Sequence, residues 1–469
     1  MRRQAIRYGL VGALVAVVIL IAQQPTLPVT GASAGRLTTS WQWTLTSPNG
    51  FGPCYPVVGC DNVSIRSLAA YNGSLYAGTA NALGAEIWHY TGASWERQIE
   101  GGLGDQQNTV ITAMAPYDGR LYAGTQQSES SGAELWAYDG ITWTRVITGG
   151  FDPTILPGQP KNTAVSSLAA FDDKLYLGTR YDYQGAQVWA YDGITITQVV
   201  SSGLANAANV AVLSLANFHG ELFAGTLNYN GGEVWRTPDG LQWSRVALNG
   251  FNNPSNIAIS ALAVLSDALY AATENPTTGA EVWRSTNGSI WLPILTGGFG
   301  SADFDRINAL ADYKGMLYAA VSHATLPQGE VWAYDGASWT RVVSGGLMHD
   351  NQTHTFAKAE ALAVLNDVLF LGTSQAQADS TVIGPEVWST HGPQAATPSP
   401  TVTETATTTR SPTPSSTDTP TPTPSATTQP PVTATPTATA TRTPEPTPTA
   451  TPTVSPGNIA TIFLPLIIK

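Results

Sequence analysis

The feature that most constrains this chain is an internal repeat, seen most completely at 215–251 (LANFHGELFAGTLNYNGGEVWRTPDGLQWSRVALNGF). A block of Leu, an aromatic or large apolar residue, two small or apolar residues and usually Thr recurs seven times, about every 49 residues from Leu75 to Leu369. A second block, Glu or Gln followed by an aliphatic residue and Trp, ends at Trp88, Trp136, Trp189, Trp235, Trp283, Trp332 and Trp388. Self-similarity at this period indicates a fold assembled from like supersecondary units.

Each unit divides into four short apolar runs, which in the fourth copy are 212–218, 221–226, 232–236 and 242–247. Tight turn pairs separate the first run from the second and the third from the fourth, as at Asn72-Gly73, Asp118-Gly119, Asp239-Gly240 and Asp335-Gly336. Asn-Gly and Asp-Gly suit two-residue hairpins because both central residues adopt positive φ. Four antiparallel strands per unit, seven times over, predict an all-β fold, a seven-bladed β-propeller at 36–394.

The innermost strands crowd the axis of such a fold, and the first run of every unit carries a small residue at its centre: Ser67, Ala113, Ser167, Ser214, Ala261, Ala309 and Ala361. The seventh unit lacks a fourth run. The missing run lies at the other end of the chain, where 43–51 (WTLTSPNGF) matches the spacing of 243–251 (WSRVALNGF). We therefore expect the propeller to be closed by the N-terminal strand as the outer strand of blade seven, which hides two strand edges.

The hairpins resemble the Asp-box of sialidase-type propellers, Ser-x-Asp-x-Gly-x-x-Trp. The nearest match is 285–291 (STNGSIW), which is one residue shorter before Gly288. Over about 39–392 the chain resembles seven-bladed β-propellers with Asp-box or kelch-like repeats, on the Thr/Pro-rich stalk of a secreted bacterial protein. The resemblance implies the fold and no catalysis, since the Arg-Ile-Pro motif of the sialidase site is not found.

The segments outside the repeats indicate export. Arg2, Arg3 and Arg7 precede the uncharged apolar run 8–22, and Ala32-Ser33-Ala34 fits a cleavage site, so 1–34 is a signal peptide or, uncleaved, an N-terminal anchor. Both alternatives place the propeller outside the cytoplasm, secreted or at the cell surface.

The C-terminal part has a different composition. We expect residues 395–456 to form a Thr/Pro-rich disordered tail, either a stalk or a passive linker, which could reach on the order of 150–200 Å at ~3.1 Å per residue. The apolar end, 457–469, is too short to span a membrane, and either a sorting tag or an incidental hydrophobic end accounts for it.

The two cysteines and the net charge limit the kinds of bond and the classes of binding partner that the chain can have. Cys54 and Cys60 are the two cysteines of the chain, and in an oxidising compartment they favour a disulfide over a metal site, which would need further ligands. Of 21 basic and 33 acidic residues, 15 and 30 fall within 36–394, a net charge of about −15. Nucleic acid is therefore excluded as a partner, and a membrane is expected only through the N-terminal anchor.

Two polar series recur with the repeat. We expect the strand carboxylates to hydrogen-bond backbone groups rather than a metal, since Gln187 replaces one of them: Glu86, Glu134, Glu233, Glu281, Glu330 and Glu386. We interpret a second series as fasteners for the crossover loops between blades: Asn62, Asn108, Asn162, Asn209 and Asn256. His349 with His354, and Asp303 with Asp305, match metal sites poorly, so no metal, cofactor or catalytic residue is predicted.

The long, dissimilar loops all emerge on one face, where binding residues are expected on a rigid scaffold. Neighbouring loops of blades three and four offer aromatic and polar side chains, which are the predicted ligand-binding residues: Tyr181, Asp182, Tyr183, Asn228, Tyr229 and Asn230. The favoured function is a binding or adhesion module for an extracellular glycan or protein. An extracellular glycan-active hydrolase or lyase is the alternative, and a purely architectural surface protein is a third possibility.

Overall fold

The structure is a computed structural model that describes residues 40–55, 59–127, 131–151, 161–378 and 381–394. The predictions for the signal segment, the stalk and the apolar C-terminus fall on 1–39 and 395–469, outside the described residues. The regular secondary structure of the described chain is almost entirely antiparallel strand, with 56% of residues in strands and 4% in helix, which confirms the all-β prediction. It contains no helix long and apolar enough to cross a membrane.

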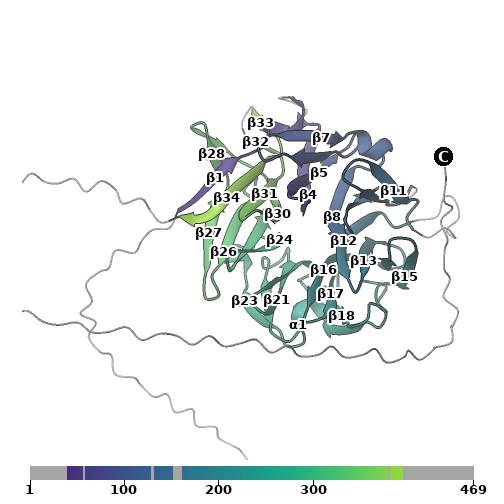
Figure 1. Cartoon of the computed structure of the whole chain (residues 1–469). Helices are drawn as coiled ribbons and strands as arrows, with labels where there is room; N and C mark the ends of the chain where they lie inside the picture. The colour runs from purple at the N-terminus through teal and green to yellow at the C-terminus, as the bar shows by residue number, and fades with distance from the viewer. Residues whose placement is uncertain (1–39, 56–58, 128–130, 152–160, 379–380, 395–469) are drawn as a thin grey trace, which may run out of the picture.

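Consecutive strands pair in groups of four, which we number as sheets one to seven (Figure 1). Sheet one holds β4 (Asn62–Tyr71), β5 (Ser74–Asn81), β6 (Ile87–Tyr90) and β7 (Trp95–Ile99). Sheet two holds β8 (Val110–Tyr117), β9 (Arg120–Gln126), β10 (Leu135–Tyr138) and β11 (Trp143–Ile147). Sheet three holds β12 (Ala164–Phe171), β13 (Lys174–Arg180), β14 (Val188–Tyr191) and β15 (Ile196–Val200).

The next three sheets repeat this order. Sheet four holds β16 (Ala211–Phe218), β17 (Glu221–Leu227), β18 (Val234–Thr237) and β19 (Ser244–Ala247). Sheet five holds β20 (Ala258–Leu265), β21 (Ala268–Glu274), β22 (Val282–Ser285) and β23 (Leu292–Leu295). Sheet six holds β24 (Arg306–Tyr313), β25 (Met316–Ser322), β26 (Glu330–Tyr334) and β27 (Trp339–Ser344).

Sheet seven joins the two ends of the described chain. Its strands are β30 (Ala359–Leu365), β31 (Val368–Thr373), β34 (Val387–Gln394) and, as the outer strand, β1 (Ser40–Leu45). β1 is antiparallel to β34, with Ser40 opposite Gln394 and Leu45 opposite Trp388.

Short elements lie in the connections. They are η1 (Asn49–Phe51), η2 (Gly101–Gly104), α1 (Asn249–Asn252), η3 (Gly298–Gly300) and three small hairpins, β2 (Cys54–Tyr55) with β3 (Gly59–Cys60), β28 (Leu347–His349) with β29 (Gln352–His354), and β32 (Ala376–Ala378) with β33 (Thr381–Ile383).

The tight turns have the conformation that their residue pairs predict. Asn72 and Gly73, between β4 and β5, have φ of 48° and 74°, and His219 and Gly220 have 51° and 75°. In the turns between the third and fourth strands of sheets two to six, an Asp or Asn side chain accepts two backbone N–H groups, as Asp239 does from Leu241 and Gln242 at 2.8 Å. Local turn chemistry thus fixes where each strand ends.

Single residue pairs link each sheet to the next at the inner strands. They are Ala80 with Val110, Gln126 with Ala164, Arg180 with Ala211, Leu227 with Ala258, Glu274 with Arg306, Ser322 with Lys358, and Ser374 with Ser64. The last pair joins sheet seven to sheet one. The sheets accordingly lie around a common centre, with their first strands innermost (Figure 1).

The core lies between neighbouring sheets. Leu135 of sheet two and Leu175 of sheet three share one apolar cluster, and both are fully buried. Phe51, also fully buried, packs its ring 5.1 Å from that of Trp88 and 5.2 Å from that of Trp95. Because each sheet is covered on both faces, its strands are apolar on both faces rather than alternating.

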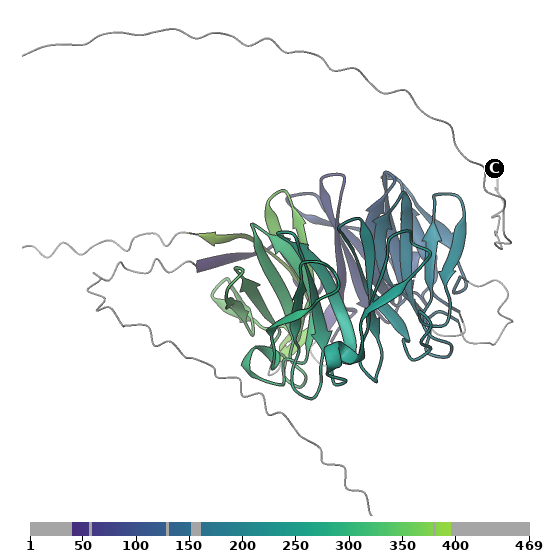
Figure 2. The same cartoon turned by 90° about the horizontal axis from the view of Figure 1, so that it is seen from below.

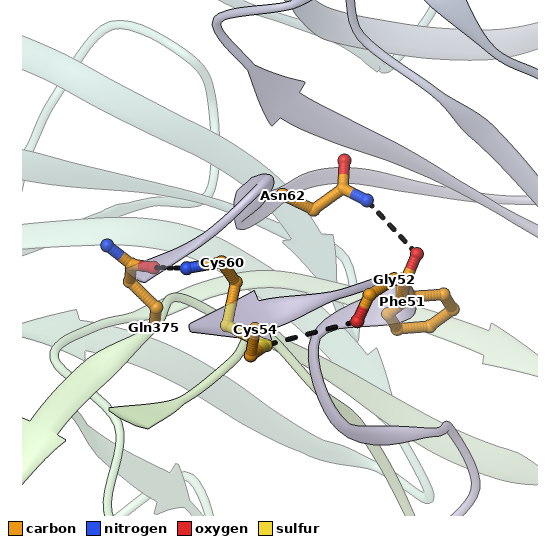
Figure 3. The surroundings of a disulfide bond; sticks show 6 residues. All are labelled: Phe51, Gly52, Cys54, Cys60, Asn62 and Gln375. Atoms are coloured by element: carbon orange, nitrogen blue, oxygen red, sulfur yellow. Dashed lines mark hydrogen bonds between the residues drawn. A yellow bond between two sulfur atoms is a disulfide. The ribbon is translucent and has the colours of Figure 1, made fainter. Parts of the chain in front are cut away.

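The predicted disulfide between Cys54 and Cys60 is present (Figure 3). The two cysteines face each other across the β2–β3 hairpin, in the connection from β1 to β4. The backbone N–H of Cys60 donates to Gln375 Oε1 at 3.1 Å, which ties the hairpin to sheet seven. The disulfide therefore stabilises the connection that leads from β1 of sheet seven to β4 of sheet one.

The two faces of the ring differ. Since strands alternate in direction, the tight turns lie on one face, and the crossovers with the loops between second and third strands lie on the other, which we call the loop face. Ser40 and Gln394 both lie at the tight-turn end of sheet seven, because β34 runs away from the loop face and β1 runs back toward it. Figure 2 shows the start of β1 and the end of β34 side by side at this edge.

Candidate functional site

The predicted binding residues lie in two loops that follow β13 and β17. Tyr183 is 61% exposed and Tyr229 is 62% exposed, and Asp182 and Asn230 are also exposed. Arg180, at the end of β13, joins the two loops. Its Nε–H donates to Asp182 Oδ2 at 3.0 Å, and the side-chain hydrogen bonds to Asp182 and Tyr229 raise the pKa of Arg180 against the effect of burial.

Tyr181 and Asn228 are not placed as predicted, since their exposed fractions are only 4% and 2%. Asn228 Nδ2 donates to Asn209 Oδ1 at 2.9 Å, and Asn228 Oδ1 accepts the backbone N–H of Asn230. Both residues stand two positions after the last residue of the Leu-initiated block, a place shared by Asn81, Gln127, Asn275, His323 and Gln375. Six of these seven residues are buried and Gln375 is partly buried, so this position belongs to the scaffold rather than to a binding surface.

The buried asparagines fasten the crossover loops, as predicted. Asn209, fully buried, donates from Nδ2 to Gly203 O at 2.9 Å and to Glu233 Oε2 at 2.7 Å. The same pair of bonds, to a crossover carbonyl and to the Glu or Gln of the unit, recurs at Asn62, Asn108, Asn162 and Asn256.

The strand carboxylates bond to side chains, which corrects the expectation that they bind backbone groups. Glu233 accepts the indole N–H of Trp235 at 2.9 Å and the guanidinium of Arg245 at 2.7 Å, besides Asn209. Gln187 accepts equivalent bonds from Asn162 and Trp189 without a charge. Among the described residues no group of three or more His, Cys, Asp and Glu side chains is arranged to hold a metal ion. The series is therefore structural.

The centre of the ring contains a cavity of about 230 Å³, which we call the axial cavity. Every sheet contributes to it from its innermost strand. The lining residues are Arg66, Thr112, Gln126, Ala164, Ser166, Arg180, Leu213, Leu227, Ser260, Arg306, Asn308 and Glu360.

Seven of the lining residues reach the axis because of a β-bulge. The pairing register of each innermost strand shifts at one residue, as between Ile65 and Ser67, where Arg66 is the extra residue. A bulge redirects the side chain of the extra residue. The equivalent positions are Thr112, Ser166, Leu213, Ser260, Asn308 and Glu360.

The axial cavity lies at the loop-face end of the ring. Its other lining residues stand where a second strand ends or a first strand begins, as Arg180 does opposite Ala211 and Arg306 does opposite Glu274. Arg180 thus belongs both to the cavity and to the cluster with Asp182 and Tyr229. The cavity and this cluster are therefore linked through Arg180, and we treat them, with the exposed Tyr183 of the same loop as Asp182, as one candidate site.

The charges of the cavity are paired. Arg66 Nη1 lies 2.6 Å from Glu360 Oε2, and the Glu360 side chain is only 4% exposed. Arg180 pairs with Asp182 at 3.0 Å and Arg306 pairs with Glu274 at 2.8 Å. A ligand in the cavity would therefore meet hydrogen-bond donors and acceptors fixed in ion pairs, and not a strong net charge of one sign.

Hydroxyl and amide groups of the cavity are bonded to the neighbouring sheet. Thr112 Oγ1 donates to Val165 O at 2.6 Å, Ser260 Oγ donates to Ile307 O at 2.6 Å, and Asn308 Nδ2 donates to Ala359 O at 2.7 Å. These bonds fix the lining side chains before any ligand arrives, so the site is preformed.

The sequence analysis missed the bulge residues. Each bulge residue directly precedes the small residue at the centre of the first run. From one copy of the repeat to the next, this position varies in charge and polarity, whereas the positions on either side are always apolar or small. A position that varies among copies of an otherwise regular strand was the available signal.

No protein-family model matches the sequence, and no curated protein matches it. Many solved structures are similar to it, and among them are the following three, all at low identity. One is the extracellular domain of a putative one-component system from B. thetaiotaomicron, with 17% identity, a TM-score of 0.49 and coverage of 73% of this chain and 40% of that one. Measured against that protein, the chain thus spans less than half the length.

The second is a lectin solved in complex with alpha methyl fucoside, with 14% identity, a TM-score of 0.38 and coverage of 60% of this chain and 96% of that one. The third is the Trypanosoma rangeli sialidase in complex with 2,3-difluorosialic acid, with 11% identity, a TM-score of 0.40 and coverage of 75% and 59%. These neighbours are β-propeller-like all-β folds. We transfer no function from them, because all three TM-scores are below 0.5.

Proposed function

We propose that the chain is a secreted or surface-displayed binding module, a seven-bladed β-propeller closed by its N-terminal strand, which binds an extracellular glycan or protein through the loop face. The seven sheets, the seven inner-strand links and the pairing of β1 with β34 support the architecture. A disulfide supports a location outside the cytoplasm.

The observation that carries the function is the link that Arg180 makes between the axial cavity and Asp182 and Tyr229 in the neighbouring loops. Charge-paired Arg, Asp and Glu side chains give donors and acceptors suited to neutral hydroxyl groups, and exposed aromatic rings offer apolar faces that pack against sugar rings. The cavity has room for on the order of seven water molecules at ~30 Å³ each, which is the scale of one sugar unit. A glycan is therefore favoured over a protein partner.

The orientation of the domain supports display. Both ends of the described chain leave from the tight-turn side, opposite the candidate site. We propose that 1–34 is a signal peptide or anchor, that 395–456 is a stalk and that 457–469 is a sorting tag. With this arrangement, the binding face points away from the point of attachment.

A glycan array probed with the full chain tests the proposal. We expect binding to a restricted set of glycans, weakened at least tenfold by Tyr183→Ala or Tyr229→Ala. Ile141→Ala, which changes an 85% exposed side chain in a tight turn, is the matched control and should bind as the wild type does. Unaltered binding by both tyrosine variants contradicts the proposed site, and an array without any binding contradicts a glycan ligand.

One observation favours the alternative of a glycan-active hydrolase or lyase. Burial and the nearby Glu274 carboxylate raise the pKa of Asp305. Glycoside hydrolases commonly use two carboxyl groups, one of which has a raised pKa and acts as the general acid. Asp305 does not line the axial cavity, and Glu274 is held by Arg306. Release of reducing ends from a bound polysaccharide, lost on Asp305→Asn, would favour the enzyme over the binding module.

A further inference from the structure

The walls of the axial cavity are chemically unlike. Sheet four contributes two aliphatic side chains, Leu213 from the bulge of β16 and Leu227 from the end of β17. Leu227 is buried with Val210, Ala211 and Ala258 in one apolar cluster, against which Leu213 packs. The side chains of these two leucines carry no hydrogen-bonding atoms, so they offer a ligand only apolar contacts.

The other side of the cavity is polar. Sheets six, seven and one place Asn308, Glu360 and Arg66 there, each at the bulge of its innermost strand. Figure 1 shows β16 and β17 across the centre from β4 and β30. One ligand in the cavity therefore meets leucine on one side and an ion pair with an amide on the other.

We infer that the cavity selects a sugar unit that bears a methyl group, as an N-acetyl sugar or a 6-deoxy sugar does. The inference rests on the proposed function and specifies its ligand. The methyl group lies against Leu213 and Leu227, while hydroxyl groups face the Arg66–Glu360 pair and Asn308.

The physical reason is the cost of an unmatched hydroxyl. A hydroxyl turned toward Leu213 and Leu227 loses its bonds to water and gains none, whereas a methyl group there removes apolar surface from water. A pocket that favours a methyl group over a hydroxyl group in this way changes the affinity for the two sugars by about tenfold or more. A purely anionic ligand fits less well, since each cavity arginine already has a carboxylate partner.

Titration calorimetry of the full chain with matched methyl glycosides tests the inference. One arm compares N-acetylglucosamine with glucose, and the other compares L-rhamnose with L-mannose, so the two sources of the methyl group are separated. We expect about tenfold tighter binding of the methyl-bearing sugar in at least one arm. Leu213→Thr should reduce the preference to within about twofold, and Leu241→Thr, at a 55% exposed turn position on the far face, should keep it.

The outcomes separate this inference from the proposed function. Equal binding within both arms by the wild type overturns the methyl preference while the binding function stands. No binding in either arm, together with an empty glycan array, overturns both. If Leu213→Thr fails to fold, the comparison of the paired sugars with the wild type still tests the methyl preference. If the variant folds and keeps the preference, the role of Leu213 and Leu227 is contradicted.

Discussion

Leu45 lies opposite Trp388 in the antiparallel pairing of β1 with β34, although the two residues stand near opposite ends of the described chain. Thr46 Oγ1 donates to Val387 O at 2.8 Å, across 341 positions, and the backbone N–H of Val387 donates to Ser47 Oγ at 2.8 Å. Trp388 is fully buried under this strand. The last sheet is therefore completed by the strand that precedes all the others in the described chain.

Deleting 1–46 should consequently destabilise the whole domain. The deletion removes Trp41, Trp43 and Leu45 from the core of sheet seven, a loss of about 3–6 kcal/mol, and exposes the edge of β34. We expect a lower thermal unfolding midpoint and self-association, measured by scanning calorimetry and size-exclusion chromatography. Deleting 1–39 is the control, and equal midpoints for the two deletions would contradict the role of β1.

The asparagine fastener gives a second prediction. Asn209→Ala leaves Glu233 Oε2 and Gly203 O without one of their donors in a buried site, which should cost about 2–4 kcal/mol of unfolding free energy. Asn209→Asp should cost more, because it places a second carboxylate beside Glu233. Asn217→Ala, which removes an exposed bond to Ala170 O, should cost less than about 1 kcal/mol. Urea denaturation measures all three, and equal values would rule out the fastener.

The strands could be predicted from sequence because their limits are local. The predicted runs 212–218 and 221–226 match β16 (Ala211–Phe218) and β17 (Glu221–Leu227) to one residue at either end. Turn residues such as Gly220 fix these limits without help from the rest of the fold. The third and fourth runs, 232–236 and 242–247, begin two residues too early against β18 and β19.

The candidate site could be predicted only in part, because it depends on contacts between units. Tyr183 and Tyr229 are exposed as expected, whereas the burial of Asn228 follows from its bond to Asn209, nineteen positions away. The axial cavity was not predicted at all. If side chains simply alternated along β16, Leu213 would lie on the opposite face from Val212 and Ser214. The register shift between β16 and β17 makes Leu213 the extra residue of a bulge, and this shift depends on the pairing of the two strands, which the sequence does not show.

A third prediction concerns pH and Glu386, whose ionic partner is a histidine where sheets one, two, four and six use arginine. Burial raises the pKa of Glu386, opposed by the 2.7 Å bond from His354 and by the nearby charge of His349, which itself pairs with Asp350. The folded state thus holds the proton more tightly than the unfolded chain does. Its contribution to stability is full below the ordinary glutamate pKa and is lost as the pH rises through the folded-state value.

We therefore expect the contribution of Glu386 to the unfolding free energy to fall as the pH rises above about 4.5, the ordinary pKa of the group. Glu386→Gln should flatten this part of the profile, and it should fold, since Gln187 fills the same position in sheet three. Urea denaturation across pH 4–8 measures both. A variant whose profile keeps the wild-type slope would show that other groups are responsible.

The last prediction separates stability from binding at the Arg66–Glu360 pair. Arg66→Met leaves the carboxylate of Glu360 buried, and Arg66 is the one ionic partner it has in the described part of the chain. The variant should lose about 2–3 kcal/mol, at or below the lower limit of about 3 kcal/mol for a broken buried pair, because the Arg66 side chain is 37% exposed. Adding Glu360→Met removes the unpaired charge and should restore most of the stability.

The double variant should nevertheless bind glycan at least tenfold more weakly than the wild type, because hydroxyl groups of the ligand lose both a donor and an acceptor. A double-mutant cycle in urea gives the stability terms, and titration with a glycan selected on the array gives the affinity. Recovered stability with lost affinity is the expected combination. Wild-type affinity in the folded double variant would remove the pair, and with it the polar wall of the axial cavity, from the binding site.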